Sequence, residues 1–401
     1  MLFDPWDRAH RPDPHSFWNH WRGQMGTMSA SGPLTGRTFQ FVMAHADVVS
    51  ALRSPTIGKE PERHLPGVDW DFAMEGPFAV LGKNMLFVDP PDHTRLRRLV
   101  RDGFSNRAMD ALEPRIAQIA ESLVDGLAGR DEIDLIAEFA LPLPVTVIAE
   151  MLGVPLEDQD HFRGWTQAIL GRGVTDDEQV MLAGMEFVNY LNDLANERRA
   201  DPTDDLTSYL LHTSEGGDSL SHEEFLAMVF LLLVAGHETT VNLIGNGVVE
   251  LASHPDEYSK LLADPDLISP AIEEILRFHG PVETATLRWV YEPQTIGDTE
   301  VAAGDLVIAV LMAANRDRAV FEDPDRFDIG RNPKSHVAFG SGIHHCLGAP
   351  LARREAAAAF EVLARRVGRL ELAVDRADLP WTNEIFLRGA SSIPVRRPSG
   401  T

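Results

Sequence analysis

The sequence has almost no cysteine: Cys346 is the only one among 401 residues. One thiol permits no disulfide within the chain, which is typical of a reducing compartment. The first 23 residues carry acids and prolines but no apolar core for a signal peptide. The longest apolar stretch, residues 225–235, is shorter than the ~20 residues that cross a bilayer. We therefore expect a soluble, cytoplasmic protein that has no contact with a membrane.

Positive charge is also scarce, since 36 Lys and Arg residues stand against 61 Asp and Glu residues and the net charge is −25. This charge argues against nucleic acid and anionic membrane as partners. Internal repeats and low-complexity tracts are absent, and 44% of the residues are hydrophobic, which is enough for a large core. We expect one compact domain over residues 1–401, mainly α with a small β-rich part.

Hydrophobic periodicity predicts the order of the elements. Expected helices cover residues 46–53, 113–127, 142–152, 159–170, 177–199 and 222–252. A strand is expected at residues 39–43, a hairpin should join 295–301 to 305–309, and another hairpin should lie within 382–398. Residues 58–83 are rich in Gly, Pro and Trp and predict a mobile loop.

The surroundings of Cys346 are unusual. It lies in FGSGIHHCLGA, residues 339–349, directly before a predicted long helix. Backbone N–H groups and the helix dipole stabilise negative charge at such a position, so a thiolate is expected, either as a nucleophile or as a metal ligand. The alternative is that an isolated cysteine is a small buried apolar residue. A functional role therefore needs partners elsewhere in the chain.

A second unusual segment, AGHETT at residues 235–240, interrupts a strongly apolar helical pattern. Gly, Glu and Thr inside a buried helix cost stability through poor helix propensity and desolvation of polar groups. This cost indicates a function. The alternative is that both threonine hydroxyls bond back to carbonyls of their own helix.

Two pairs at helical spacing complete the set of motifs. Glu274 and Arg277 lie at i and i+3, a spacing that in isolation predicts a weak surface ion pair. His93 and Arg97 lie at i and i+4 after a proline pair, so they share one helical face. Two donors one turn apart suit the two oxygens of a carboxylate.

In order and spacing, these four motifs resemble those of the cytochrome P450 family of haem-thiolate proteins. The resemblance implies the single-domain P450 fold, with a haem loop and proximal helix at residues 339–368 and a locally distorted distal helix at about 222–253. It also implies haem b, ligated through Cys346. The other implied site residues are His93, Arg97, Arg288 and His344 at the propionates; Phe339, Gly340, Gly348 and Ala235 beside the macrocycle; Glu238 and Thr239 for proton delivery to oxygen; and a structural triad of Glu274, Arg277 and Arg326.

The resemblance further implies a monooxygenase that uses O₂ and electrons from a ferredoxin and its reductase. The pocket positions are mostly apolar, so a hydrophobic small molecule, such as a secondary metabolite, is the expected substrate. These positions are Met85, Leu86, Ile169, Leu232, Ala235, Val282, Thr284, Ile385 and Phe386. An arginine patch is expected to receive the ferredoxin, with ordinary solvated helix faces as the alternative; it consists of Arg95, Arg98, Arg101, Arg353 and Arg354.

Several other functions remain open. A peroxide-driven or oxidative-coupling enzyme would share the same haem machinery, and a haem-based ligand binder or sensor would lack turnover. A hydrolase could pair Cys346 with His344 or His345, but no orienting Asn or Asp is visible around this loop. A zinc-protease signature fails because Val241 replaces its second histidine, and a dinucleotide fingerprint fails because His345 replaces its third glycine.

Overall fold

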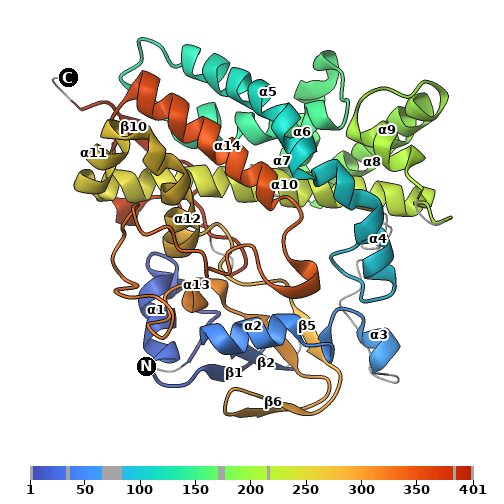
Figure 1. Cartoon of the computed structure of the whole chain (residues 1–401), viewed down its shortest axis with the longest axis vertical. Coiled ribbons are helices and arrows are strands. Elements are labelled where there is room, and N and C mark those ends of the chain that lie inside the picture. Colours follow the sequence, from blue (N-terminus) through green and yellow to red (C-terminus); the bar gives the residue numbers. More distant parts are fainter. Residues whose placement is uncertain are drawn as a thin grey trace.

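The computed structural model describes residues 3–32, 37–65, 84–169, 177–214, 217–382 and 385–398. Helices form most of the molecule; most of the strands lie at one end of it, and a small three-stranded sheet lies near the opposite end (Figure 1). The helices are α1 (Pro14–Arg22), α2 (His45–Arg53), α3 (Pro61–His64), α4 (Asp92–Arg101), α5 (Asn106–Asp125), α6 (Pro142–Met151), α7 (Gln159–Ile169), α8 (Asp177–Ala200), α9 (Leu206–His212), α10 (His222–Ser253), α11 (Pro255–Ala263), α12 (Ile268–His279), α13 (Leu311–Ala314) and α14 (Ala349–Val362). The strands are β1 (Thr27–Ser31), β2 (Thr38–Val42), β3 (Ile57–Gly58), β4 (Glu132–Asp134), β5 (Arg288–Val290), β6 (Gln294–Ile296), β7 (Thr299–Val301), β8 (Leu306–Ala309), β9 (Glu371–Leu372) and β10 (Pro394–Arg396).

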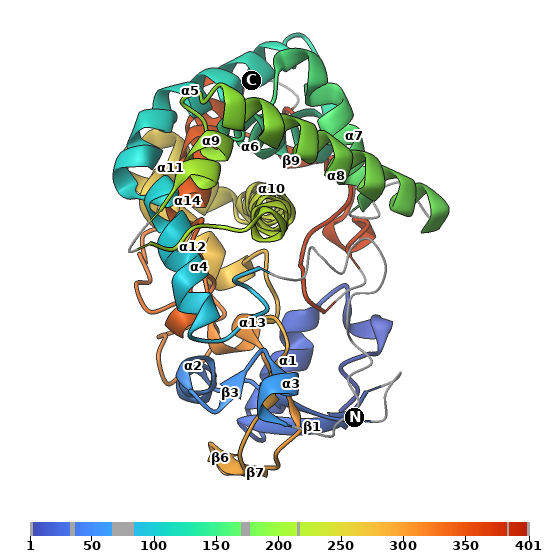
Figure 2. The same cartoon turned by 90° about the vertical axis from the view of Figure 1, so that its right-hand side faces the viewer.

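Helix α10 runs through the middle of the molecule and is seen end-on in Figure 2. Ser221 and Glu224 form a reciprocal capping box at its start. The helix is long and apolar enough to cross a membrane, but 67% of that apolar window is buried inside the protein. Our expectation that no segment was long enough is therefore wrong, because it considered only the uninterrupted run 225–235. The burial identifies α10 as a core helix.

Close helix packing connects α10 to α14 and α12. A Cβ atom added at Gly247 of α10 would lie 2.4 Å from the Phe360 ring and 2.9 Å from Cδ1 of Ile275. Only glycine permits this approach. The contact sets the distance between α10 and the helix that follows Cys346, and so it positions the two central sequence motifs relative to each other.

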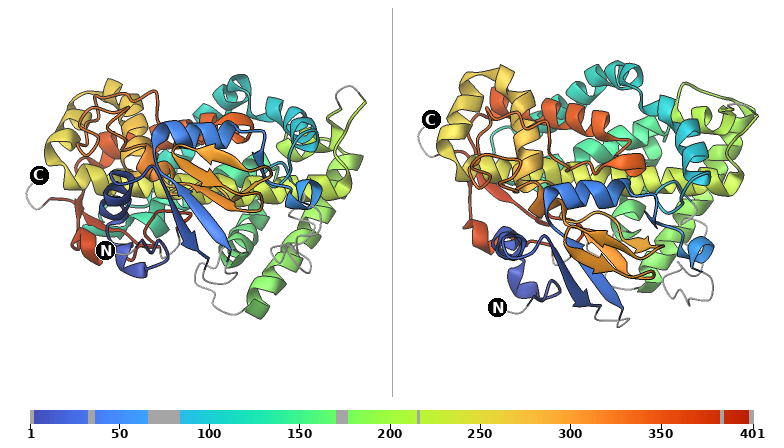
Figure 3. Two further views of the ribbon diagram at one scale, coloured as in Figure 1. Left: turned by 90° about the horizontal axis from the view of Figure 1, so that it is seen from below. Right: turned by 60° about the horizontal axis from the view of Figure 1, so that its bottom comes forward.

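The main sheet has the strand order β1-β2-β8-β5-β3 (Figure 3). Strand β2 pairs with β8 in parallel, with Phe39 opposite Leu306 and Val42 opposite Ala309. The predicted hairpin between 295–301 and 305–309 is wrong, because β6 and β7 pair with each other while β8 joins the main sheet. Alternation of side chains predicts a strand but does not identify its partner.

The expected C-terminal hairpin is found in part: the Thr382 amide donates to the carbonyl of Gly389 at 2.8 Å, but residues 394–396 pair elsewhere. Strand β10 pairs with β4 and β9, and an isolated bridge joins Trp381 to Ala390. The other helix and strand predictions agree with the structure to within two residues, except that α5 begins seven residues before the expected 113. Pro114 lies in the interior of this helix, and Ser105 provides its N-cap. Of the expected loop, residues 66–83 lie outside the described residues.

Candidate functional site

The loop before α14 is shaped by its glycines. Gly340 and Gly342 have φ values of +71° and +76°, in the left-handed region that favours glycine. A Cβ at Gly342 would lie 2.5 Å from the carbonyl oxygen of Leu52, at the end of α2. The amide of Cys346 donates to the carbonyl of Phe339 (2.9 Å), which closes the loop. The sequence therefore folds here into a rigid turn that presents one sulfur atom.

The backbone amides of Gly348 and Ala349 hydrogen-bond to the sulfur of Cys346. Burial by the surrounding protein raises the pKa of the thiol, and these amides lower it by less. The expected thiolate is therefore not produced by the helix start alone. A bound metal ion deprotonates a coordinating thiol, and the amides are placed to accept the resulting charge.

Helix α4 presents His93 and Arg97 toward this loop. His93 is 2% exposed, and neither of its ring nitrogens has a hydrogen-bond partner among the described residues. Burial, followed by the charge of Arg97, lowers the His93 pKa. An Nη atom of Arg97 donates to the carbonyl of His345 at 2.7 Å. The pair thus lies beside the cysteine, and the buried His93 ring lacks a polar partner among the described residues.

Arg288 and His344 extend the same cluster. The His344 ring centroid lies 4.4 Å from that of His93. In the described part of the chain, Nε2 of His344 and Nε of Arg288 are buried without a partner. Burial lowers the pKa of Arg288 to about 10, and burial together with Arg288 and Lys59 lowers the pKa of His344 to about 2. Unpaired buried donors of this kind are costly and indicate an anionic ligand.

Lys59 belongs to this cluster, and our sequence analysis missed it. Its ammonium donates to the Thr286 hydroxyl (2.6 Å) and to the carbonyls of Thr286 (3.0 Å) and Leu287 (2.6 Å). It thereby holds the chain directly before Arg288. Burial, followed by Arg288, lowers the Lys59 pKa. No spacing pattern around Lys59 in the sequence indicated this contact.

These residues fit a flat, dianionic, metal-containing cofactor. Four side chains with donor groups (His93, Arg97, Arg288 and His344) surround the loop, and three of them have donor atoms without partners. A Cβ added at Gly340 or Gly348 would meet no protein atom within 4 Å, so a planar group can approach the backbone there. A porphyrin with two carboxylates and a thiol-ligated iron would pair with these donors, lie flat against the glycine backbone and bind the sulfur of Cys346.

On α10, Thr239 and Glu238 lie one turn from Ala235. The Thr239 hydroxyl donates to the carbonyl of Ala235 at 2.9 Å, and Asn242 Nδ2 donates to Glu238 Oε1 at 3.4 Å. The hydroxyl does bond back to its own helix, which was the alternative considered above. The expected local distortion is not found, because residues 222–253 are α-helical throughout.

A second buried glutamate, Glu355, lies between α10 and α14 and was also missed. Its Oε2 has no partner among the described residues, and its bond to Thr240 does not offset its burial, which raises the pKa to about 8. Glu355 is therefore a carboxyl group that keeps its proton at neutral pH.

The structural triad contains Arg331 in place of the predicted Arg326. Glu274 and Arg277 are fully buried and form two bonds of 2.7 Å, and Arg331 Nε reaches Glu274 Oε1 at 3.2 Å. The Arg326 side chain is 62% exposed beside Asp328, although its backbone carbonyl accepts from Arg277. The two arginines lie five residues apart in an irregular loop, where no periodicity shows which side chain points inward.

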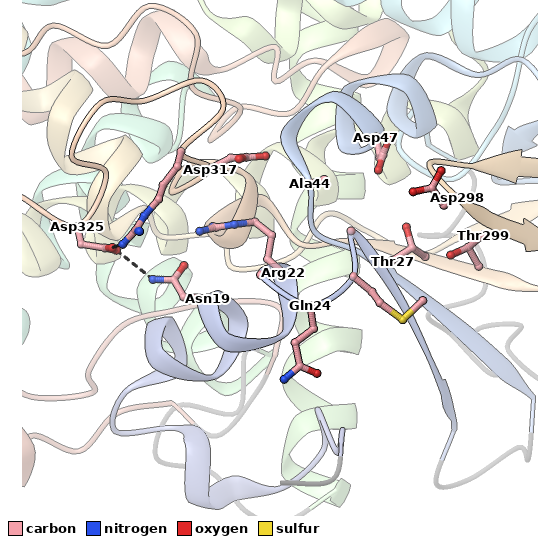
Figure 4. Close-up of a pocket in the computed structure, with 14 residues that line it drawn as sticks. Asn19, Arg22, Gln24, Thr27, Ala44, Asp47, Asp298, Thr299, Asp317 and Asp325 are labelled. Carbon is pink, nitrogen blue, oxygen red and sulfur yellow. Dashed lines mark hydrogen bonds and ion pairs between the residues drawn. The ribbon is translucent and has the colours of Figure 1, made fainter.

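The structure brings four of the nine predicted pocket residues together. Thr284 donates its hydroxyl proton to the carbonyl of Ile385 at 3.0 Å, and Val282 forms a β-bridge with Leu387, next to Phe386. Met85 and Leu232 are buried in the main core, and Leu86 and Ile169 pack against it. A separate cavity of about 660 Å³ between α1, α2 and the β6–β7 hairpin is lined largely by polar residues and includes none of the predicted site residues (Figure 4).

Each arginine of the expected docking patch is paired with an acid of the same chain. The pairs are Arg95 with Glu224, Arg98 with Asp218, Arg101 with Asp102, Arg353 with Glu273, and Arg354 with Asp110 and Glu113. Local charge is therefore much closer to neutral than the arginines alone suggested.

Comparison with known proteins supports the geometry. The family model described as cytochrome P450 matches residues 174–387. Cytochrome P450 107B1 of Saccharopolyspora erythraea is 47% identical over 359 residues, covering 88% of each chain. Vitamin D(3) 25-hydroxylase of Pseudonocardia autotrophica is 45% identical, covering 88% of this chain and 86% of its own. The solved structure of the bacillaene polyketide synthase cytochrome P450 PksS of Bacillus subtilis 168 superposes with a TM-score of 0.91 at 37% identity, covering 98% of this chain and 99% of that one.

The chain belongs to the cytochrome P450 family, and the predicted fold class is confirmed. It is an oxidoreductase of the monooxygenase type, with haem b as its thiolate-ligated cofactor.

Proposed function

We propose that this chain is a soluble, cytoplasmic monooxygenase in which Cys346 ligates the haem iron. His93, Arg97, Arg288 and His344 bind the propionates, with Phe339, Gly340, Gly348 and Ala235 beside the macrocycle. The observation that carries this proposal is the cluster of buried donors that lack partners among the described residues and surround the only thiol of the chain. When bound, the haem supplies the iron at which O₂ is activated and one oxygen atom is passed to the substrate.

Proton delivery is the proposed role of Glu238 and Thr239. The Thr239 hydroxyl has one proton, which it donates to the carbonyl of Ala235. Rotation of this hydroxyl moves the proton from that carbonyl toward the haem side of α10. Glu238 is 7% exposed and accepts a hydrogen bond from Asn242. In this proposal it replaces the proton that Thr239 gives up.

The proposed substrate is a hydrophobic small molecule of the secondary-metabolite class. The names of two relatives refer to vitamin D(3) and to the bacillaene polyketide synthase. Most of the proposed pocket side chains are apolar and suit such ligands. They are Met85, Leu86, Ile169, Leu232, Ala235, Val282, Ile385 and Phe386, with Thr284 adding one hydroxyl.

The proposed electron donor is a ferredoxin that docks near α14. Arg353 lies over the Phe339 ring at 4.4 Å and makes two bonds to Glu273 (2.6 and 3.0 Å), so it is held rigidly behind the cysteine loop. An acidic donor would have to compete with Glu273 and Asp110 for Arg353 and Arg354. We expect docking to depend on these two arginines more than on Arg95 and Arg98, which pair with acids at or just before the start of α10.

The test of the iron ligand is Cys346→Ala, compared with Leu347→Ala as a neighbouring control. The reduced, CO-treated parent and control should show the strongly red-shifted Soret band of thiolate ligation, and Cys346→Ala should lose it. A Cys346→Ala protein that kept this band would contradict the proposed ligand.

The test of the proton path is Thr239→Ala in the haem-loaded enzyme, with Thr240→Ala as the matched control. Loss of the Thr239 hydroxyl should leave NADPH consumption in place while more oxygen escapes as peroxide, so product per NADPH falls. Unchanged coupling in Thr239→Ala would show that other groups deliver the protons.

A further inference from the structure

Two chain segments that are far apart in the sequence form one wall of the proposed substrate pocket. We call residues 281–285 and 385–388 the wall segments. Val282 forms a β-bridge with Leu387, the Glu283 amide donates to the carbonyl of Phe386 at 2.9 Å, and the Thr284 hydroxyl donates to Ile385. The position of this pair of segments therefore determines where four proposed substrate-contacting residues lie, namely Val282, Thr284, Ile385 and Phe386.

The carboxylate between Val282 and Thr284 faces away from the pocket, toward the N-terminal part of the chain. Glu283 is fully buried. Its two oxygens accept from Arg11 at 2.9 and 3.0 Å, and Oε1 also accepts from the indole N–H of Trp18 at 2.7 Å. Arg11 precedes α1 and Trp18 lies within it, so one carboxylate joins the first wall segment to α1.

The second wall segment is joined to the same place by Arg388. This side chain is 2% exposed and donates to the carbonyls of Arg11 (2.6 Å) and Pro12 (3.3 Å). Its guanidinium lies 3.9 Å from the ring centroid of Trp381. Both wall segments are therefore bonded to residues 11–18, the first through the side chains of Arg11 and Trp18 and the second through the carbonyls of Arg11 and Pro12. These residues belong to none of the predicted site motifs.

We propose that Arg11, Trp18 and Glu283 form a clasp that sets the position of the wall segments and thereby the size of ligand that the pocket accepts. The inference rests on the proposed function, because it concerns the pocket of that same site. The three side chains are positioning residues and do not touch the substrate.

Two physical arguments support a role in specificity. A buried ion pair gives little net stability relative to apolar packing, but its directional bonds select one geometry. Apolar contacts alone tolerate repacking. In addition, successive side chains of a β-bridged segment point to opposite sides, so the bonds of Glu283 to α1 place Val282 and Thr284 on the other side of the chain.

The test compares Trp18→Phe with Trp21→Phe in the haem-loaded protein. Both tryptophans are buried in α1. Trp21 Nε1 has no hydrogen-bond partner among the described residues, so Trp21→Phe makes the side chain smaller without removing a hydrogen bond. Imidazole and the larger phenylimidazole are titrated, and the shift of the Soret band gives each Kd. Trp18→Phe should change the ratio of the two Kd values by about tenfold, the effect of roughly one methylene group in a pocket, whereas Trp21→Phe should leave the ratio unchanged.

A second pair of variants covers the ion pair. Arg11→Met leaves Glu283 with Trp18 alone and should shift the same ratio, and Arg11→Lys should restore part of it. If the ratio stayed constant in Trp18→Phe and Arg11→Met, even with a lower Tm, the clasp would be merely structural and the proposal overturned. A parent protein without any Soret response to imidazole would instead contradict the proposed function, and the clasp with it.

Discussion

Two buried clusters of positive charge differ in how their polar atoms are satisfied. In the closed cluster, Arg277 and Arg331 share the carboxylate of Glu274, and Arg277 also donates to three backbone carbonyls. In the open cluster, His93, His344 and Arg288 leave buried nitrogen atoms without partners in the described part of the chain. Both clusters belong to the same molecule, so the difference in hydrogen bonding between them does not come from poor packing of the protein as a whole.

The difference distinguishes scaffold from ligand site. A buried charge whose bonds are all made within the protein contributes to the folded geometry. An unpaired donor costs about 1–3 kcal/mol and is tolerated where a ligand supplies the missing partner. The closed cluster should therefore control the stability of the protein without haem, and the open cluster should control its affinity for haem.

The largest expected effect is in the closed cluster. Arg277→Met leaves the buried Glu274 with only Arg331 and the Asp328 amide as partners, which should lower the free energy of unfolding by about 3–5 kcal/mol. Arg331→Met is the control and should cost less, because Glu274 keeps both bonds to Arg277. Urea unfolding measures both, and equal effects would contradict the assignment of Arg277 as the central member.

A somewhat smaller effect is expected at Glu355, a buried acid that has no cationic partner among the described residues and keeps its proton. Its pKa is raised to about 8 by burial, while in the unfolded chain it titrates near 4.5. The unfolded state therefore binds fewer protons between these values, and stability falls as pH rises through this range, by about 3 kcal/mol. Glu355→Gln should remove this fall, as seen in urea midpoints from about pH 5 to pH 8. If the urea midpoints of the parent and of Glu355→Gln depended on pH in the same way, Glu355 would not be the group that causes the fall in stability.

In the open cluster, a substitution should change the affinity for haem and should not lower the stability of the protein without haem. His93→Leu removes a desolvated donor, so the unfolding free energy of the apoprotein should stay equal or rise. Haem transfer to apomyoglobin should become about tenfold faster, since a hydrogen bond to a charged group contributes about 1.5–3 kcal/mol. Arg95→Leu, on the same helix but paired with Glu224, is the control and should leave the transfer rate unchanged.

The smallest effect is expected for the exposed arginines. Arg98 and Asp218 form a surface pair at 2.8 Å with side chains 37% and 47% exposed. Arg98→Gln should change the free energy of unfolding by less than about 1 kcal/mol. A loss comparable to that of Arg277→Met would remove the distinction between exposed and buried pairs.

Local patterns predicted much of the site. The spacing of His93 and Arg97, the i and i+3 relation of Glu274 and Arg277, and the glycines before Cys346 lie within single helices or one short loop. Backbone geometry alone places such residues together. The same reasoning predicted most helix boundaries, because helical bonds join residues four positions apart.

Contacts between distant segments could not be predicted. Arg331, Lys59 and the Arg11–Glu283 pair join irregular segments, where no period indicates the direction of a side chain. The Arg11–Glu283 pair spans 272 positions. The partner of β8 was missed for the same reason, since a parallel strand pair requires a long connection and leaves no local turn signal.

The parallel pairing of β2 with β8 has a consequence for how the protein is made. The N-terminal residues leave the ribosome first, but β2 finds its neighbour β8 only after residues 306–309 have emerged. Until then Trp18, Phe39 and Phe41, all buried in the finished molecule, lack Leu306 and Ile308 of the same core cluster. During synthesis these aromatic residues are therefore open to aggregation and to chaperones until more than 260 further residues have been made.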